Sequence, residues 1–245
     1  MNADEVVNLS DIQAAAGRIT DHAVRTHSDR SQTLSALTGA DLVLKFEILQ
    51  FTASFKDRGA ANRLLTLKTD ERESGVVAAS AGNHAQAVAY HGGRLDIDTK
   101  IVMPVTAPFS KVRHTEQLGA TVVIAGETVS ESADAAATIA GEEGRTFVHP
   151  YDDAAVIAGQ GTCGLEFGVD HPDLEVVVVP VGGGGLAAGM ATALKALLPG
   201  IEVIGVQTEA YPAMARAIAG EPPPEFRNET LADGIAVKKP GTLTT

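Results

Sequence analysis

The feature that most constrains the fold is a strand-and-helix unit that repeats along the chain. Short apolar runs with strand character alternate with segments whose apolar residues recur at helical spacing. Such alternation favours parallel strands joined by right-handed crossovers. The sequence therefore predicts an α/β fold with parallel sheets flanked by helices. The predicted strands are residues 42–46, 76–79, 100–103, 121–124, 176–179 and 203–206. One predicted helix begins at Lys56, and the others span residues 82–90, 109–118, 129–143, 154–167, 186–197 and 210–219.

The units divide into two predicted lobes. Residues 1–72 and 151–245 form the large domain, incomplete at its C-terminal end, and residues 73–150 form the small domain. An amphipathic helix capped by Ser10 or Asp11 opens the chain, and residues 68–74 read as a charged break. Residues 176–179 are all valine, which is typical of a strand in a sheet covered on both faces.

Composition excludes several classes of protein. The chain has 245 residues, of which 44% are hydrophobic, so it can bury a sizeable core. Its net charge of -12 argues against binding to nucleic acid or to anionic membranes, and no apolar run approaches the length of a bilayer span. Cys163 is the only cysteine, and the N-terminus has no secretory pattern. We therefore expect a soluble, cytoplasmic protein.

Lys56 is the candidate nucleophile. It follows Phe55 at the start of a predicted helix, where the helix dipole disfavours a second positive charge and should lower the pKa of the amine. A neutral amine is what Schiff-base chemistry requires. The competing interpretation is an exposed lysine paired with Asp57, which is the commoner case for a lysine taken alone.

Four consecutive glycines, Gly182, Gly183, Gly184 and Gly185, join a predicted strand to a helix. Bare backbone N–H groups at a helix start can close on a phosphate. One alternative is a tight connection in a packed sheet, for which fewer glycines suffice. Another is a dinucleotide fingerprint, because Gly182, Gly184 and Ala187 satisfy its spacing, although that fingerprint normally opens the first unit of a fold.

Residues 80–84 form a second loop between a strand and a helix, with the sequence Ser-Ala-Gly-Asn-His. Small residues allow close approach of the backbone, so the loop suits a carboxylate, with His84 contributing mainly its backbone N–H. The alternative is an ordinary helix cap by Ser80 or Asn83.

These three stretches meet at the carboxyl ends of parallel strands, where α/β folds bind ligands. An amine, a carboxylate loop and a phosphate cradle together suit pyridoxal phosphate. From about Leu42 to Gly241 the sequence resembles the fold-type II pyridoxal-phosphate enzymes, whose two lobes resemble those of the tryptophan synthase β subunit. Within that class it resembles the threonine ammonia-lyases (threonine dehydratases) and serine racemases. The supporting motifs are residues 54–56, 80–84, 149–153, 158–162, 182–185 and 232–234.

The resemblance implies roles for individual residues. Lys56 would hold the cofactor as a Schiff base and then act as the base at the substrate Cα. The implied cofactor contacts are Phe55, Lys56, Asn83, Gly182, Gly183, Gly184, Gly185 and Leu186, and the implied substrate contacts are Ser80, Ala81, Gly82, Asn83 and His84.

In the implied reaction threonine loses its α-proton and its β-hydroxyl, and the resulting enamine hydrolyses to 2-oxobutanoate and ammonia. Serine would give pyruvate by the same path. Serine racemase, another amino-acid lyase of the class, and a binding protein without turnover are the alternatives. Racemases of this class carry a serine at the position of Ala81, so its methyl group favours the lyase. A nicotinamide-dependent enzyme would have no use for Lys56.

The resemblance also implies a divalent-cation or potassium site at Glu209 and the backbone of Ala213, and a homo-oligomer. Relatives continue beyond the point that matches Thr245 and supply there a serine or threonine for the pyridine nitrogen. We therefore expect a fragment, a naturally shortened protein, or one completed by a partner.

Overall fold

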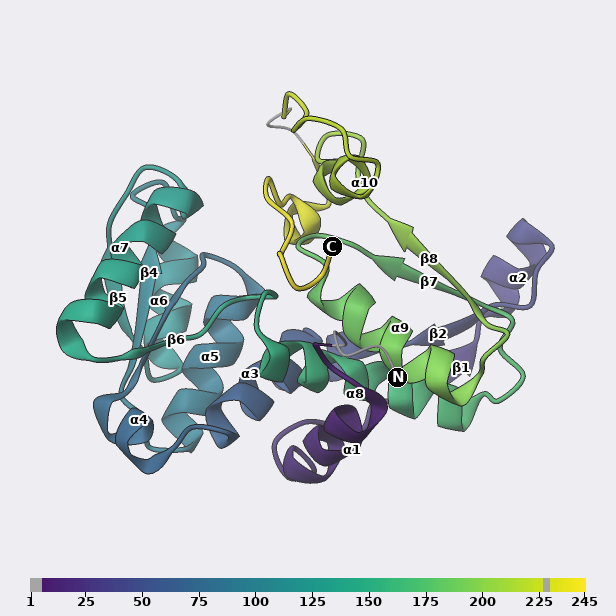
Figure 1. Cartoon of the computed structure of the whole chain (residues 1–245), viewed down its shortest axis with the longest axis horizontal. Helices are drawn as coiled ribbons and strands as arrows, with labels where there is room; N and C mark the ends of the chain where they lie inside the picture. The colour runs from purple at the N-terminus through teal and green to yellow at the C-terminus, as the bar shows by residue number, and fades with distance from the viewer. Residues whose placement is uncertain (1–5, 227–229) are drawn as a thin grey trace.

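The computed structural model describes residues 6–226 and 230–245, whose helices and strands lie in two groups on either side of helix α3 (Figure 1). The helices are α1 (Leu9–Arg18), α2 (Gln32–Thr38), α3 (Lys56–Leu65), α4 (Thr69–Ser74), α5 (Asn83–Arg94), α6 (Phe109–Gln117), α7 (Val129–Glu143), α8 (Ala154–Asp170), α9 (Gly185–Leu197) and α10 (Ala213–Ile218). The strands are β1 (Ser28–Arg30), β2 (Val43–Lys45), β3 (Val76–Ala79), β4 (Thr99–Met103), β5 (Thr121–Ile124), β6 (Thr146–Phe147), β7 (Val176–Pro180) and β8 (Glu202–Val206). Two 3-10 helices, η1 (Glu47–Leu49) and η2 (Asp233–Ile235), complete the elements of these ranges. Within the same ranges, none of the helices is long and apolar enough to span a bilayer.

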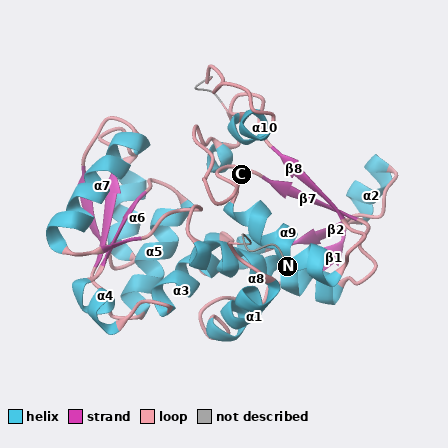
Figure 2. Ribbon diagram, viewed as in Figure 1, coloured by secondary structure: helices cyan, strands magenta, loops and turns pink. Residues whose placement is uncertain are grey.

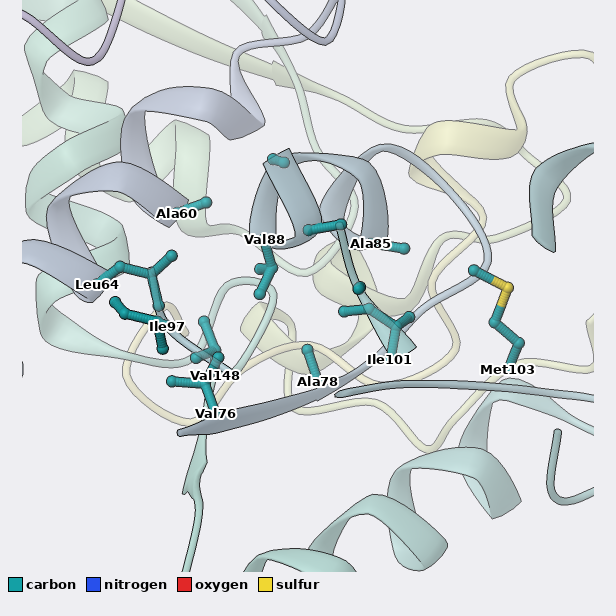
Figure 3. Packing of buried hydrophobic residues seen from close by; sticks show 13 residues of the cluster. Ala60, Leu64, Val76, Ala78, Ala85, Val88, Ile97, Ile101, Met103 and Val148 are labelled. Carbon is teal, nitrogen blue, oxygen red and sulfur yellow. The ribbon is translucent and has the colours of Figure 1, made fainter. Parts of the chain in front are cut away.

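A parallel sheet with the strand order β5-β4-β3-β6 forms the core of the first group (Figure 2). Side chains of a strand alternate between the two faces of a sheet. Val76 and Ala78 therefore belong to one buried cluster, with α5 and the end of α3 (Figure 3), and Val77 and Ala79 to another, with α7. The predicted α/β fold with parallel sheets flanked by helices is confirmed here, and the exact domain bounds stay a prediction.

The second group contains the parallel pair β7–β8, which packs against α8 and α9. Val177 and Val179 are buried, but Val176 and Val178 are 44% and 61% exposed. The prediction of a strand covered on both faces is therefore wrong. Among the described residues, the β7–β8 pair is covered by helices on one face only. The valines of β7 therefore point alternately toward these helices and toward the open face.

Several predicted elements match the structure and others were missed. The bounds of β5 and α7 are those predicted. Residues 69–74 form α4 rather than a break, with no buried residue to give it a periodic pattern. Strand β2 lies within the predicted strand 42–46, but its antiparallel partner β1 and helix α2 were not predicted. The cap of α1 is Asn8 rather than Ser10 or Asp11, since the Asn8 side chain accepts hydrogen bonds from both of their backbone N–H groups.

Helices α3 and α8 cross through a contact between glycines. A Cβ atom added at Gly159 would lie 2.6 Å from the Arg58 carbonyl oxygen and 2.7 Å from the Gly59 Cα. Backbone atoms cannot move aside as a flexible side chain can, so the helices approach this closely only with glycine at Gly159. The crossing fixes α3, and with it Lys56, against the longest helix of the described chain.

Gly159→Ala should lower the free energy of unfolding by about 1–3 kcal/mol, because the new methyl group forces the two helix backbones apart. The matched control is Gly141→Ala in α7, where an added Cβ meets no atom within 4 Å. That change should leave stability unchanged or raise it by up to about 1 kcal/mol through helix propensity. Denaturant unfolding of both variants measures the difference, and equal stability of the two would contradict the close crossing.

Candidate active site

Lys56 is the first residue of α3, and its amine points back to the segment that precedes α8. Its Nζ donates a hydrogen bond to the Pro150 carbonyl oxygen at 2.7 Å and lies 5.3 Å from the centre of the Phe55 ring. Burial of the amine lowers the pKa of Lys56 from 10.5 to about 8. The predicted direction is right, but the cause is loss of solvent rather than the helix dipole.

Asp57 is not the partner of Lys56. Its carboxylate accepts hydrogen bonds from Thr52 and faces His91, and the side chain is fully buried. The interpretation of Lys56 as an exposed lysine paired with Asp57 is therefore wrong. The Lys56 amine donates its hydrogen bond to a neutral carbonyl oxygen rather than to a carboxylate, so no negative charge opposes the effect of burial in favouring the uncharged amine.

Residues 80–84 connect β3 to α5. The Ser80 hydroxyl accepts a hydrogen bond from the Gly82 backbone N–H at 3.1 Å, and Gly82 precedes the helix without a side-chain cap. The alternative of a cap by Ser80 or Asn83 is therefore wrong, and the first turn of α5 keeps its N–H groups open to a ligand. Asn83 is exposed and Ala81 is half-buried against the small-lobe core.

His84 has a structural contact. Its Nε2 lies 3.0 Å from the Val148 carbonyl oxygen, so this nitrogen carries the proton. Burial, reinforced by the charges of Lys56 and His149, lowers the pKa of His84 to about 3. The imidazole is neutral and fastens the start of α5 to the segment after β6, which agrees with a contribution through the backbone.

The four glycines lie between β7 and α9. Gly184 has φ +99°, a conformation that favours glycine, and no side chain caps α9. A Cβ atom at Gly183 would lie 2.3 Å from the Tyr151 ring. No backbone N–H of residues 182–187 donates a hydrogen bond to another residue of the described chain. Unpaired N–H groups at the start of a 13-residue helix fit a phosphate.

One short segment, residues 148–153, brings these parts together. Its Val148 carbonyl contacts His84, its Pro150 carbonyl accepts from Lys56, and its Tyr151 ring packs on Gly183. Residues 148–153 thus contact the Lys56 amine, the start of α5 and the glycine loop. The sequence identifies residues 149–153 as a motif typical of the family, but it does not predict that this segment contacts His84, Lys56 and Gly183.

The C-terminal segment, residues 239–245, adds a further layer that sequence reasoning missed (Figure 1). The Gly183 carbonyl accepts hydrogen bonds from the Gly241 backbone N–H at 3.1 Å and from the Thr244 hydroxyl at 2.7 Å. The Asp152 carboxylate accepts from two backbone N–H groups of the same segment. These contacts tie the backbone of the glycine loop and Asp152 to the C-terminal segment.

The remaining predicted residues are less informative. Leu186 packs into the core beside β7, so it can offer a ligand only its backbone N–H. Glu209 is exposed, and Ala213 is a buried first residue of α10. Among residues 6–226 and 230–245, no group of three or more carboxylate, imidazole or thiol side chains could hold a metal ion. A cation at Glu209 and Ala213 stays a prediction.

Comparison with known proteins agrees with this geometry. A family model described as pyridoxal-phosphate dependent enzyme matches residues 19–245. The chain is 49% identical to an L-threonine ammonia-lyase of Thermotoga maritima over 98% of its own length. It spans 60% of the length of that relative.

Solved structures show the same fold. The processed form of threonine deaminase isoform 2 from Solanum lycopersicum superimposes with a TM-score of 0.90 at 39% identity, over 96% of this chain and 65% of that one. Maize serine racemase gives a TM-score of 0.92 at 31% identity, over 98% of this chain and 73% of that one. The predicted resemblance to fold-type II enzymes is confirmed, and the dinucleotide interpretation of the glycine loop is set aside. The chain belongs to the pyridoxal-phosphate dependent enzyme family.

Proposed function

We propose that this chain carries the catalytic core of a threonine ammonia-lyase, which converts threonine to 2-oxobutanoate and ammonia and serine to pyruvate and ammonia. The observation that carries the proposal is the place of Lys56. Its amine, with a lowered pKa, contacts the segment that also packs on the glycine loop. The similarity to proteins named as threonine ammonia-lyase and threonine deaminase supports the choice of reaction.

Pyridoxal phosphate, when bound, supplies an electron sink that makes the Cα proton of an attached amino acid acidic. The N–H groups of residues 182–187 and the dipole of α9 hold the phosphate. Lys56 would hold the cofactor through its Nζ and, as a neutral amine, would accept the substrate Cα proton. The resemblance implies that Phe55 and Asn83 would contact the cofactor as well.

Residues 80–84 hold the substrate carboxylate with the small side chains and open N–H groups at the start of α5. This places the Cα proton toward Lys56. Ala81 offers only a methyl group on the opposite side, where a racemase needs a proton donor. We therefore expect elimination of the β-hydroxyl to be favoured over inversion at Cα, and the methyl side chain of Ala81 supports the lyase over the racemase alternative.

The wider setting is also a proposal. The net charge of -12 and the lack of a membrane-spanning helix in the described ranges fit a protein whose partner is a small amino acid rather than nucleic acid or membrane. We infer a cytoplasmic homo-oligomer. A relative that binds the cofactor without turnover is the second candidate.

Lys56→Ala should abolish the yellow colour of the purified protein with pyridoxal phosphate and reduce 2-oxobutanoate release from threonine by at least about 100-fold. The control is Lys68→Ala, since Lys68 is exposed before α4 and should change neither property. Absorption spectra and a ketoacid assay measure both. Colour without ketoacid in the unmodified chain would favour the binding protein.

In the cofactor-free protein, acetylation of Lys56 should rise with pH around a midpoint near 8, because only the neutral amine reacts. The titratable groups facing it from neighbouring segments are His84 and His149, whose pKa values burial lowers, so neither changes charge in this range. Peptide mass spectrometry after brief acetic anhydride treatment follows the reaction. A midpoint near 10.5 would show that the amine is fully solvated.

Ala81→Ser should raise the ratio of serine racemisation to serine elimination by at least about tenfold, because the new hydroxyl supplies a proton on the face opposite Lys56. Chiral chromatography and pyruvate release measure the two rates on one sample. Racemisation as fast as elimination in the unmodified protein would instead overturn the preference for the lyase.

A further inference from the structure

The buried carboxylate of Asp57 has no part in the proposed reaction, although it follows Lys56 directly. The side chain has no exposed surface. Its Oδ2 accepts hydrogen bonds from the backbone N–H of Thr52 at 2.8 Å and from the Thr52 hydroxyl at 3.0 Å, and its Oδ1 lies 2.9 Å from His91 Nε2. A buried carboxylate is costly unless such donors surround it, so each of the three contacts matters.

His91 is equally buried and lies on a different helix, α5. Because a carboxylate only accepts hydrogen bonds, His91 Nε2 must carry the proton that it shares with Asp57. The Tyr90 and Phe51 rings stand edge-on to the imidazole, with centroids 5.0 Å and 6.5 Å away. His91 Nδ1 has no partner among the residues that the structure describes. Asp57 is thus the one hydrogen-bond partner of this ring among those residues.

The pair joins the two helices whose first residues are Lys56 and Asn83. The Thr52 contacts hold the turn that leads into α3, where Ala53 has φ +56°, a conformation that is strained for alanine. On its other side α3 is anchored to α8 by Arg58, which pairs with Glu166 at 2.7 Å. Asp57 and His91 are therefore the polar link of α3 toward α5.

We propose that Asp57 and His91 form a positioning pair that sets the Lys56 amine against the start of α5, and hence against the place where substrate is held. The inference rests on the proposed role of Lys56. His91 does not touch the reacting atoms and acts through the placement of α3. Its N–H, rather than its bulk, is the feature that the pair requires.

The test compares His91→Leu, which keeps bulk without a donor, with His91→Gln, whose amide N–H can still reach Asp57. Two quantities are measured: the pH midpoint of Lys56 acetylation in the cofactor-free protein, and the fraction of Lys56 trapped by borohydride after addition of pyridoxal phosphate. The control is Leu64→Val, in the buried core at the far end of α3, which costs packing without touching the pair. Thermal unfolding of each variant records stability.

His91→Leu should raise the acetylation midpoint toward 10.5 and reduce the fraction of Lys56 trapped with pyridoxal phosphate about tenfold at limiting cofactor, because a loosened α3 admits water to the amine. His91→Gln should restore most of both properties, and Leu64→Val should alter stability alone. If His91→Leu does not fold, Asp57→Asn is the second variant, since it keeps the shape and removes the charge.

A variant that lowers the unfolding temperature but leaves both readouts unchanged would make the pair merely structural. Equal effects of His91→Leu and His91→Gln would show that the hydrogen bond is not needed. Either result overturns the proposal. If pyridoxal phosphate is not trapped on Lys56 even in the unmodified chain, the proposed function fails, while the acetylation midpoint still decides whether the pair positions the amine.

Discussion

The position of helix α3, which begins with the Lys56 amine, depends on Arg58 two residues later. The Arg58 guanidinium is buried and pairs with two carboxylates. Arg58 is 1% exposed and pairs with Glu47 and Glu166, both at 2.7 Å. Burial alone would lower the pKa of Arg58, but the hydrogen bonds from the two carboxylates outweigh it and raise that pKa. Removing either carboxylate would leave buried guanidinium N–H groups without their acceptor, and the Glu166 pair holds α3 on α8.

The other contacts of the site follow from that anchor. The glycine contact of α3 with α8 sets how closely they pack, and residues 148–153 run directly into α8. The same segment therefore carries Pro150 to Lys56 and Tyr151 to Gly183. The position of the amine relative to the phosphate cradle therefore depends on the packing of α3 on α8 and on the segment that leads into α8.

The sequence allowed the α/β fold and the three chemical motifs to be predicted, because these depend on local spacing and on residues with few other uses. Helix α7 and strand β5 have the predicted bounds since their patterns are regular. Short α4 and strand β1 were missed because they bury little and leave weak patterns. The link between Asp57 and His91 spans 34 positions, and no local pattern could indicate it.

The open face of β7–β8 has a practical consequence for handling this polypeptide. Val178 is 61% exposed and Val206 45%, so adjacent strands present aliphatic side chains directly to solvent. Aliphatic patches of this kind promote self-association, while the net charge of -12 opposes it through repulsion that salt screens. Solutions of the chain should accordingly stay clearest in dilute, low-salt buffer and become turbid as ionic strength rises.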